Sequence, residues 1–195
     1  MNTAITALVF VIETITSVFL FFVILRFMLQ LARADFYNPI SQAVVKITNP
    51  VLLPLRKIIP GLFGIDLASL ILALIIQILF GEVMYLLIWG SVLNPVYLLI
   101  WGLLATIMFI SYILLIGILV LVISSFVAPF SAHPALSLVR QLMQPLLSPI
   151  QKFIPPVGGL DFSVMVLGMI IYVCQIFLGG IAQTLQVNPA LVLGI

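Results

Sequence analysis

The sequence predicts an all-α membrane protein whose four transmembrane helices form two tandem repeats. Of its 195 residues, 65% are hydrophobic and only 6% are charged, whereas a soluble domain carries about 25% charged residues. Four apolar runs exceed the roughly 20 residues that a membrane-spanning helix needs. They cover residues 5–32, 66–90, 96–127 and 161–187.

A proline motif defines the repeats, because every member recurs exactly once at a constant offset of 95 residues. The first copy contains Pro39, Pro50, Pro54, Lys57, Pro60 and Asp66, and the second contains Pro134, Pro145, Pro149, Lys152, Pro155 and Asp161. Self-similarity at a fixed period indicates repeated structural units. We therefore predict two repeats, residues 1–95 and 96–195, each with two spans.

The first span is expected to remain in the mature protein. It is longer than the apolar core of a signal peptide and has neither a basic leading region nor a clear cleavage site. Near its end, Arg26 is expected to extend its side chain toward the lipid headgroups, as long cationic side chains near helix ends do.

Between the first two spans, the sequence predicts a pair of short helices bounded by prolines. Residues 39–48 place Ile40, Ala43, Val44 and Ile47 at helical spacing. Asn49 then precedes Pro50, which suggests a cap followed by proline at the first position of a second helix, residues 50–59. We expect this pair to lie in the membrane interface; the alternative is a re-entrant segment shielded by protein or lining a water-filled cavity.

The second connecting segment is expected to repeat this design. His133 precedes Pro134 as a turn or cap residue, and Gln144 precedes Pro145. Asp66 and Asp161 stand at the starts of spans two and four, where an aspartate accepts hydrogen bonds from free backbone N–H groups. For Asp66, an ion pair with Arg56 or Lys57 or an ion-binding role is the alternative.

Charge predicts the orientation of the chain. All seven Lys and Arg residues lie in or beside the two connecting segments, and cytoplasmic loops carry the excess of such residues. The connecting segments should therefore face the cytoplasm, with both termini and the turn at residues 91–95 outside. Lys46, Arg56, Lys57 and Lys152 are candidate contacts for anionic headgroups or a protein partner.

Two glutamates interrupt the apolar spans of the first repeat. Glu13 and Glu82 should lie at a similar depth of roughly 12 Å from the outer ends of their helices, so they could meet. One interpretation is a protonated glutamate hydrogen-bonded between helices, and the other is an ion- or proton-handling site. Met108 and Phe177 replace them in the second repeat, which makes any such site asymmetric.

The sequence offers no support for catalysis, a bound cofactor or nucleic-acid binding. It contains no recognisable nucleophile–base motif or phosphate-binding loop, and one His with one Cys does not supply the usual zinc ligands. Cys174 is expected to be a small buried apolar residue of the fourth span.

The first copy of the motif resembles the repeat of the YggT family, also called YlmG, over essentially the whole chain. The residues that carry this resemblance are Asn38-Pro39, Thr48-Asn49-Pro50, Pro54, Arg56-Lys57, Pro60 and Gly64-x-Asp66. The second copy departs from the motif at His133, Met143-Gln144 and Gln151. The resemblance implies a protein of the bacterial inner membrane, associated with osmotic-stress tolerance and potassium uptake; plastid and cyanobacterial relatives are associated with cytochrome assembly and nucleoid or division-related organisation.

Two classes of function follow from these observations. The first is a non-enzymatic membrane scaffold or assembly factor that acts through the connecting helices, together with a membrane-protein partner or further copies of the chain. The alternative is a component of small-ion transport, of potassium or protons, in osmotic adaptation. The duplicated proline motif favours the scaffold, whereas Glu13 and Glu82 favour transport.

Overall fold

The computed structural model describes residues 3–61, 64–127, 131–154 and 161–195. Within these ranges the chain forms six α-helices and one short 3-10 helix: α1 (Thr3–Leu31), α2 (Pro39–Ile58), α3 (Leu67–Trp89), α4 (Pro95–Val127), α5 (Pro134–Gln151), α6 (Phe162–Thr184) and η1 (Pro189–Leu191). Helices α1, α3, α4 and α6 are long and apolar enough to cross a membrane. The predicted class, an all-α protein with four spans in tandem repeats, is confirmed.

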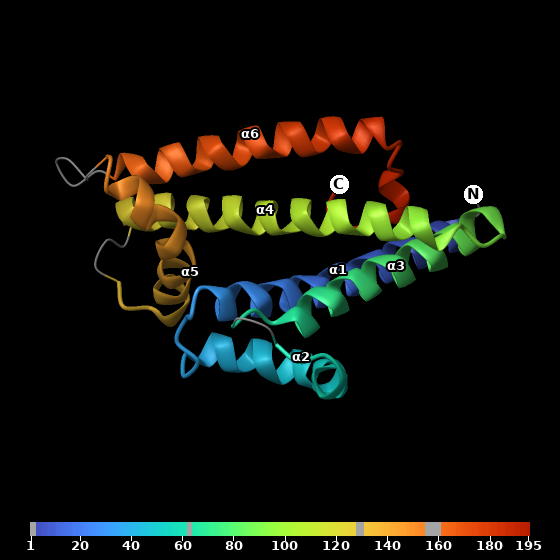
Figure 1. Cartoon of the computed structure of the whole chain (residues 1–195), viewed down its shortest axis with the longest axis horizontal. Helices are drawn as coiled ribbons and strands as arrows, with labels where there is room; N and C mark the ends of the chain where they lie inside the picture. The colour runs from blue at the N-terminus through green and yellow to red at the C-terminus, as the bar shows by residue number, and fades with distance from the viewer. Residues whose placement is uncertain (1–2, 62–63, 128–130, 155–160) are drawn as a thin grey trace.

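Each repeat consists of a span, a connecting helix and a second span. In the first repeat α1 packs on α3, in the second α4 packs on α6, and contact between α3 and α4 joins the two. The connecting helices α2 and α5 lie toward one end of the bundle, while the N-terminus and the turn between α3 and α4 lie at the other (Figure 1). This arrangement places the duplicated motif at a single end of the molecule.

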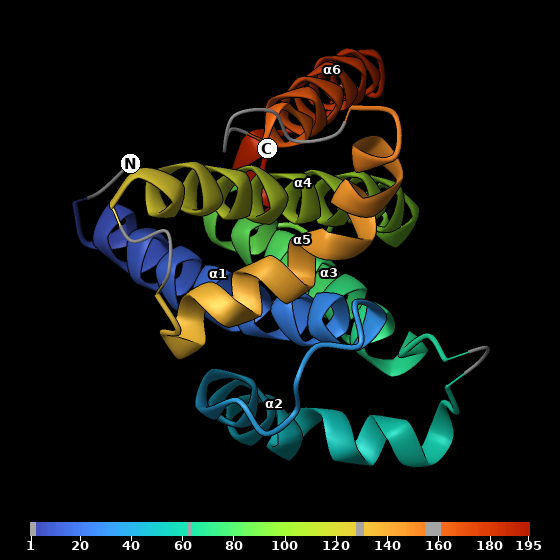
Figure 2. The same cartoon turned by 90° about the vertical axis from the view of Figure 1, so that its left-hand side faces the viewer.

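The expected pairs of short helices are each one helix, which corrects the prediction. Pro50 and Pro54 lie inside α2, and Pro145 and Pro149 lie inside α5. Proline lacks the backbone N–H that would bond one turn back and its ring displaces that carbonyl, so it bends a helix without ending it. Figures 1 and 2 show both helices changing direction along their length. Pro60 follows α2, whereas Pro155 lies outside the described residues.

The buried face of α2 also differs from the predicted one. Four residues at helical spacing are buried, namely Ser41, Val44, Thr48 and Leu52, whereas Ala43 and Ile47 are exposed. Ser41 lies near Arg33 and Thr48 bonds to Arg26, so the first half of α2 runs antiparallel to the end of α1. The buried face of α2 therefore alternates polar and apolar side chains, and part of the predicted apolar face lies outward.

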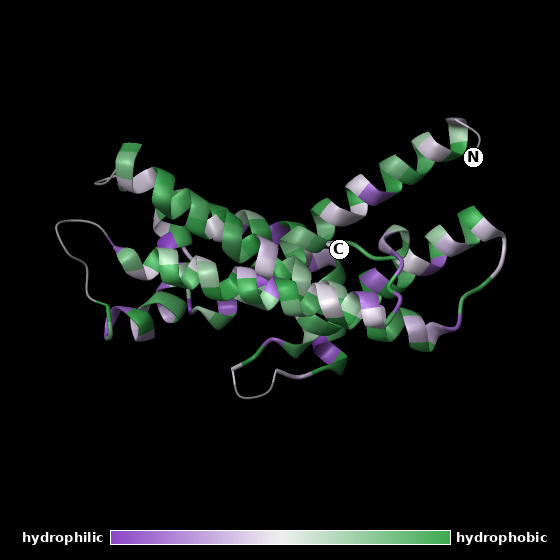
Figure 3. Ribbon diagram, turned by 90° about the horizontal axis from the view of Figure 1, so that it is seen from above, coloured by the Kyte–Doolittle hydropathy of each residue, from purple (hydrophilic) through white to green (hydrophobic). Residues whose placement is uncertain are grey.

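Most residues of the spans are hydrophobic, as the ribbon colours in Figure 3 show, and large apolar side chains lie on their outer surface. Large apolar side chains such as Phe10, Leu79 and Phe177 are exposed on it, as expected where a helix faces lipid rather than water. Cys174 is exposed on this surface of α6, so the prediction that it is buried is wrong.

The segment after α6 turns back into the bundle, which the sequence did not predict. Leu191, Val192 and Leu193 are buried. Gln77 of α3 binds the Leu193 backbone twice: its Nε2 donates to the carbonyl oxygen and its Oε1 accepts from the amide, both at 2.9 Å. Non-helical backbone inside a membrane protein requires such partners because no water reaches it. Gln77 thus enables irregular backbone to pack between spans.

Candidate functional site

Arg56 and Asp66 form an ion pair that joins the end of α2 to the start of α3. Asp66 is the N-cap of α3: its Oδ1 accepts from the Ser69 backbone amide at 3.4 Å, and its Oδ2 accepts from Arg56 Nη2 and from the Ser69 hydroxyl. The same Arg56 nitrogen donates to Gln30 Oε1 of α1 at 3.1 Å. Asp66 is therefore both the predicted cap and the partner of Arg56, and the three helices α1, α2 and α3 meet there.

Burial opposes ionisation of Asp66, whose side chain is only 4% exposed. The hydrogen bonds from Arg56 and Ser69, with the positive charge of Arg56, outweigh that burial and hold the pKa of the carboxyl below its usual range. Asp66 is consequently a carboxylate at neutral pH, bound to its partners rather than free to exchange protons.

The second repeat builds the same connection without the positive charge. Gln151 occupies the position of Arg56, and its Nε2 donates to Asp161 Oδ2 at 2.8 Å. Asp161 caps α6 by accepting from the Ser163 amide at 2.9 Å. The hydrogen bond between the connecting helix and the capping aspartate is thus present in both repeats, whereas the positively charged donor belongs to the first repeat.

Arg26 is buried between α1 and α2 rather than extended toward the headgroups, which corrects the prediction. Its Nη1 donates to Thr48 Oγ1 at 2.6 Å, to Asn49 Oδ1 at 2.8 Å and to the Val45 carbonyl at 3.3 Å. Thr48 and Asn49 therefore receive a guanidinium instead of capping a second helix. Leu121 and Met143, which replace Arg26 and Thr48 in the second repeat, are apolar.

Asn38 and His133 cap the connecting helices, and Asn38 also joins the repeats. Asn38 Oδ1 accepts from the Ile40 amide at 2.9 Å, and His133 Nδ1 accepts from the Ala135 amide at 3.2 Å. In addition, Asn38 Nδ2 donates to the Pro134 carbonyl at 2.8 Å. Pro39 and Pro134 each occupy the first turn of their helix, where the missing N–H has no cost.

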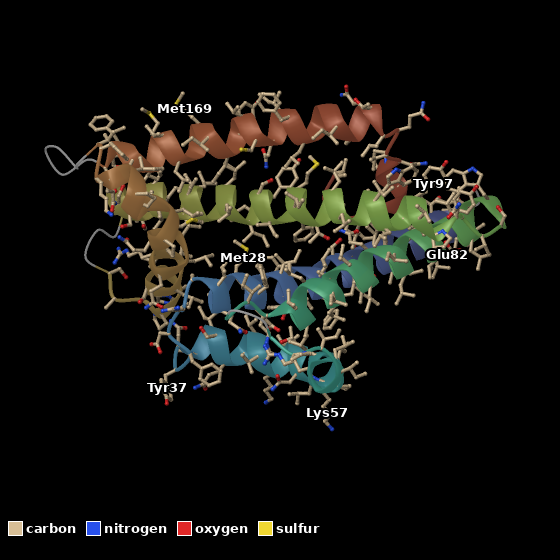
Figure 4. All side chains as sticks on the ribbon, viewed as in Figure 1. Met28, Tyr37, Lys57, Glu82, Tyr97 and Met169 are labelled. Atoms are coloured by element: carbon tan, nitrogen blue, oxygen red, sulfur yellow. The ribbon has the colours of Figure 1, made fainter. Side chains whose placement is uncertain are left out.

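The lysines predicted to contact anionic headgroups or a protein partner are exposed, whereas Arg26 is buried. Lys46 and Lys57 lie on α2 and Lys152 follows α5. Figure 4 shows Lys57 pointing away from the bundle. Beside it, Asn49, Pro50, Pro54 and Arg56 help to line a shallow groove on the outside of α2.

The intramembrane glutamates are placed separately. Glu13 is exposed on α1, and Glu82 lies toward the end of the bundle that contains Tyr97 (Figure 4). One carboxyl oxygen of Glu82, Oε1, is buried without a hydrogen-bond partner. In the described part of the chain no hydrogen bond connects the two glutamates.

Two polar residues beside the arginines were not singled out from the sequence. Gln30 lies in the last turn of α1 and Ser41 in the first turn of α2, and both line a cavity of about 390 Å³ with Arg26, Arg33 and Arg56. A single serine in the first turn of a helix is a weak sequence signal. Across the described ranges, no group of three His, Cys, Asp or Glu residues is placed to hold a metal ion.

Comparison with known proteins identifies the family. The family model described as CCB3/YggT matches the chain twice, over residues 5–88 and 97–182. The chain is 36% identical to the protein YggT of Escherichia coli strain K12 over 192 residues, which are 95% of each chain. An uncharacterized protein of Pseudomonas aeruginosa is 45% identical over 171 residues, or 81% of each chain, and one of Vibrio alginolyticus is 41% identical over 159 residues, or 81% of this chain and 85% of the relative. No solved structure matches. The chain therefore belongs to the CCB3/YggT family of membrane proteins.

Proposed function

We propose that this protein is a non-enzymatic scaffold or assembly factor of the bacterial inner membrane, linked to osmotic-stress and membrane homeostasis. The observation that supports this role is the duplicated attachment of a bent connecting helix, through Arg56–Asp66 in one repeat and Gln151–Asp161 in the other. Both attachments fix the angle of the helix against the following span. A rigid, repeated presentation of a surface suits binding better than turnover.

The presented surface fits a partner within or at the membrane. Ile47, Val51 and Leu53 are exposed on α2, with Lys46 and Lys57 on the same helix. Apolar side chains flanked by cations match both a helical membrane partner and an anionic headgroup layer. In this proposal α2 and α5 face the cytoplasm. Labelling of cysteines introduced at Ser91 and Lys57 from the same side of the membrane would contradict this orientation.

Complementation of a deletion strain under osmotic stress tests the scaffold. Replacing Arg56 and Lys57 together with glutamine should abolish complementation while the protein remains in the membrane. The control removes two carboxyl groups elsewhere, by Glu13→Gln with Glu82→Gln, and should be tolerated. If the Arg56 and Lys57 variant complements the deletion and the Glu13 and Glu82 variant does not, the carboxyl groups are the functional site.

Small-ion transport is the second candidate, and the unpartnered Glu82 Oε1 favours it. An unpaired carboxyl oxygen within a span is costly, and such groups often mark ion or proton paths. Purified protein in liposomes should be tested for potassium and proton flux, with Glu82→Gln as the matched variant. Robust flux that Glu82→Gln removes would favour transport over the scaffold.

A further inference from the structure

A cationic cavity lies between the end of α1, the turn that follows it and the first half of α2. Its volume is about 390 Å³, within the range of roughly 300–1,000 Å³ that small-molecule sites occupy. Arg26, Arg33 and Arg56 line it together with Gln30 and Ser41, and the remaining walls are apolar. Three guanidinium groups around one cavity suggest an anionic occupant.

The charges around this cavity are not balanced by the protein. Asp66 pairs with Arg56, and no carboxylate lines the cavity itself. Among the residues that the structure describes, the guanidinium of Arg33 makes no hydrogen bond or ion pair. The nearby Asp35 carboxyl accepts from the Tyr37 backbone amide at 2.9 Å. A net positive charge therefore remains at the cavity.

Arg26 is held in a fixed orientation at the wall of this cavity. Its Nη1 atom makes the three bonds to α2 described above, whereas its Nε and Nη2 atoms make no hydrogen bond to any described residue. A guanidinium anchored on one side is preorganised, because its planar fork loses little freedom when it binds a ligand through the other side. Arg26 thus supplies positive charge to the site as well as support for α2.

Ser41 provides independent evidence for a ligand. Its side chain is on the buried stripe of α2, is 5% exposed and lines the cavity, yet its Oγ has no hydrogen-bond partner. Buried hydroxyl groups are nearly always hydrogen-bonded, so an exception requires an explanation. A ligand oxygen in the cavity would accept the missing hydrogen bond.

From this arrangement we infer that the cavity binds a phosphate group, and that its source is the headgroup of an anionic phospholipid. Guanidinium forks match phosphate oxygens in geometry and charge, and the Ser41 hydroxyl adds a neutral donor. The apolar walls formed by Leu29, Phe36 and Val44 suit the glycerol and acyl portions of a lipid, which free phosphate lacks. The inference goes beyond the scaffold, since it requires no protein partner.

The second repeat supports the assignment by lacking the same groups. Leu121, Leu136 and Gln151 replace Arg26, Ser41 and Arg56 at the constant offset. All three cationic or hydroxyl donors are therefore lost together, while the Asp161 cap is kept. One lipid per chain is expected.

The test measures lipid binding to the purified full-length protein by native mass spectrometry in detergent. Phosphatidylglycerol should bind with a stoichiometry of one, and phosphatidylcholine, which has no net charge, should bind at least tenfold more weakly. Arg33→Gln with Ser41→Ala should weaken phosphatidylglycerol binding about tenfold, the factor expected for losing bonds to a charged group. Arg140→Gln removes one positive charge from α5, outside the cavity, and should change binding less than about twofold.

Ser41→Leu separates the cavity from general surface charge. It copies Leu136 of the second repeat and fills the cavity without changing the charge, so it should abolish the one-lipid complex. Unchanged thermal unfolding would show that the variant is folded. Retained phosphatidylglycerol binding in Ser41→Leu, or equal losses in Arg33→Gln with Ser41→Ala and in Arg140→Gln, would overturn the inference. Inorganic phosphate is added in a third arm, and displacement of the lipid by millimolar phosphate would overturn the lipid source.

Discussion

Gln151 donates to Asp161 at the position where, 95 residues earlier, Arg56 pairs with Asp66. In both repeats the acceptor is the aspartate that caps the following span, and the donor lies in the last turn of the connecting helix. The two repeats thus contain a natural comparison between a charged and a neutral donor in one geometry. A neutral donor therefore makes the same contact in the second repeat that a positively charged donor makes in the first.

The first prediction is that Arg56→Gln preserves the fold, because glutamine already serves this position in the second repeat. Asp66→Ala removes the helix cap and the hydrogen bonds that the carboxylate accepts from Arg56 and Ser69, so it should destabilise the protein by about 1–3 kcal/mol. Thermal unfolding in detergent, followed by circular dichroism, measures both effects. Equal destabilisation by the two variants would show that the charge of Arg56 is required after all.

The second prediction concerns acid. The pKa of Asp66 is lowered in the folded protein, chiefly by Arg56 and Ser69 against the effect of burial. Its contribution to stability is therefore complete above the unfolded-state pKa, about 3.9, and is lost as the pH falls through the lower folded-state pKa. The stability difference between the unmodified protein and Asp66→Asn should be constant from about pH 5 to pH 8 and should shrink below about pH 4. A difference that grows on acidification would contradict the ionised pair.

The third prediction compares the two helix caps. Asn38→Ala and His133→Ala each remove one cap, which costs about 1 kcal/mol. Asn38→Ala also removes the bond to the Pro134 carbonyl, so it should cost about 1 kcal/mol more than His133→Ala. Chemical denaturation of both variants under one set of conditions tests the difference. Equal losses would mean that the inter-repeat bond adds no stability.

The fourth prediction concerns the segment that returns after α6. A Cβ atom at Gly81 would lie 2.6 Å from the Leu191 carbonyl oxygen and 2.5 Å from Leu98 Cδ2, and a backbone carbonyl yields poorly. Gly81→Ala should displace this segment and speed its cleavage by protease. Gly179→Ala is the matched control, because a Cβ atom there would meet no atom within 4 Å. Equal cleavage of the two variants would contradict the close packing.

Local signals explain why the spans and caps could be predicted from the sequence. A long apolar run predicts a membrane helix, and Asp66, Asp161 and His133 stand in cap positions that depend on neighbouring residues alone. Thr48-Asn49-Pro50 misled the prediction because a cap before a proline and a proline bend within one helix have the same local sequence. In α2, Thr48 and Asn49 bind Arg26, which lies 22 residues from Thr48, and α5 continues through Pro145 without such a partner among the described residues. The site around Ser41 and the return of Leu193 to Gln77 likewise depend on contacts between distant segments.

The bond between Gln77 and Leu193 also sets an order of completion during synthesis. The two residues are 116 positions apart, so at about 5–20 residues per second the Gln77 amide waits roughly 6–23 s for its final partner. During that interval all four spans can enter the membrane while the seam between α3 and α4 still holds an unsatisfied amide. The returning segment then closes the seam last. A chain that stops short of Leu193 therefore lacks both hydrogen bonds that the Gln77 amide makes in the folded protein.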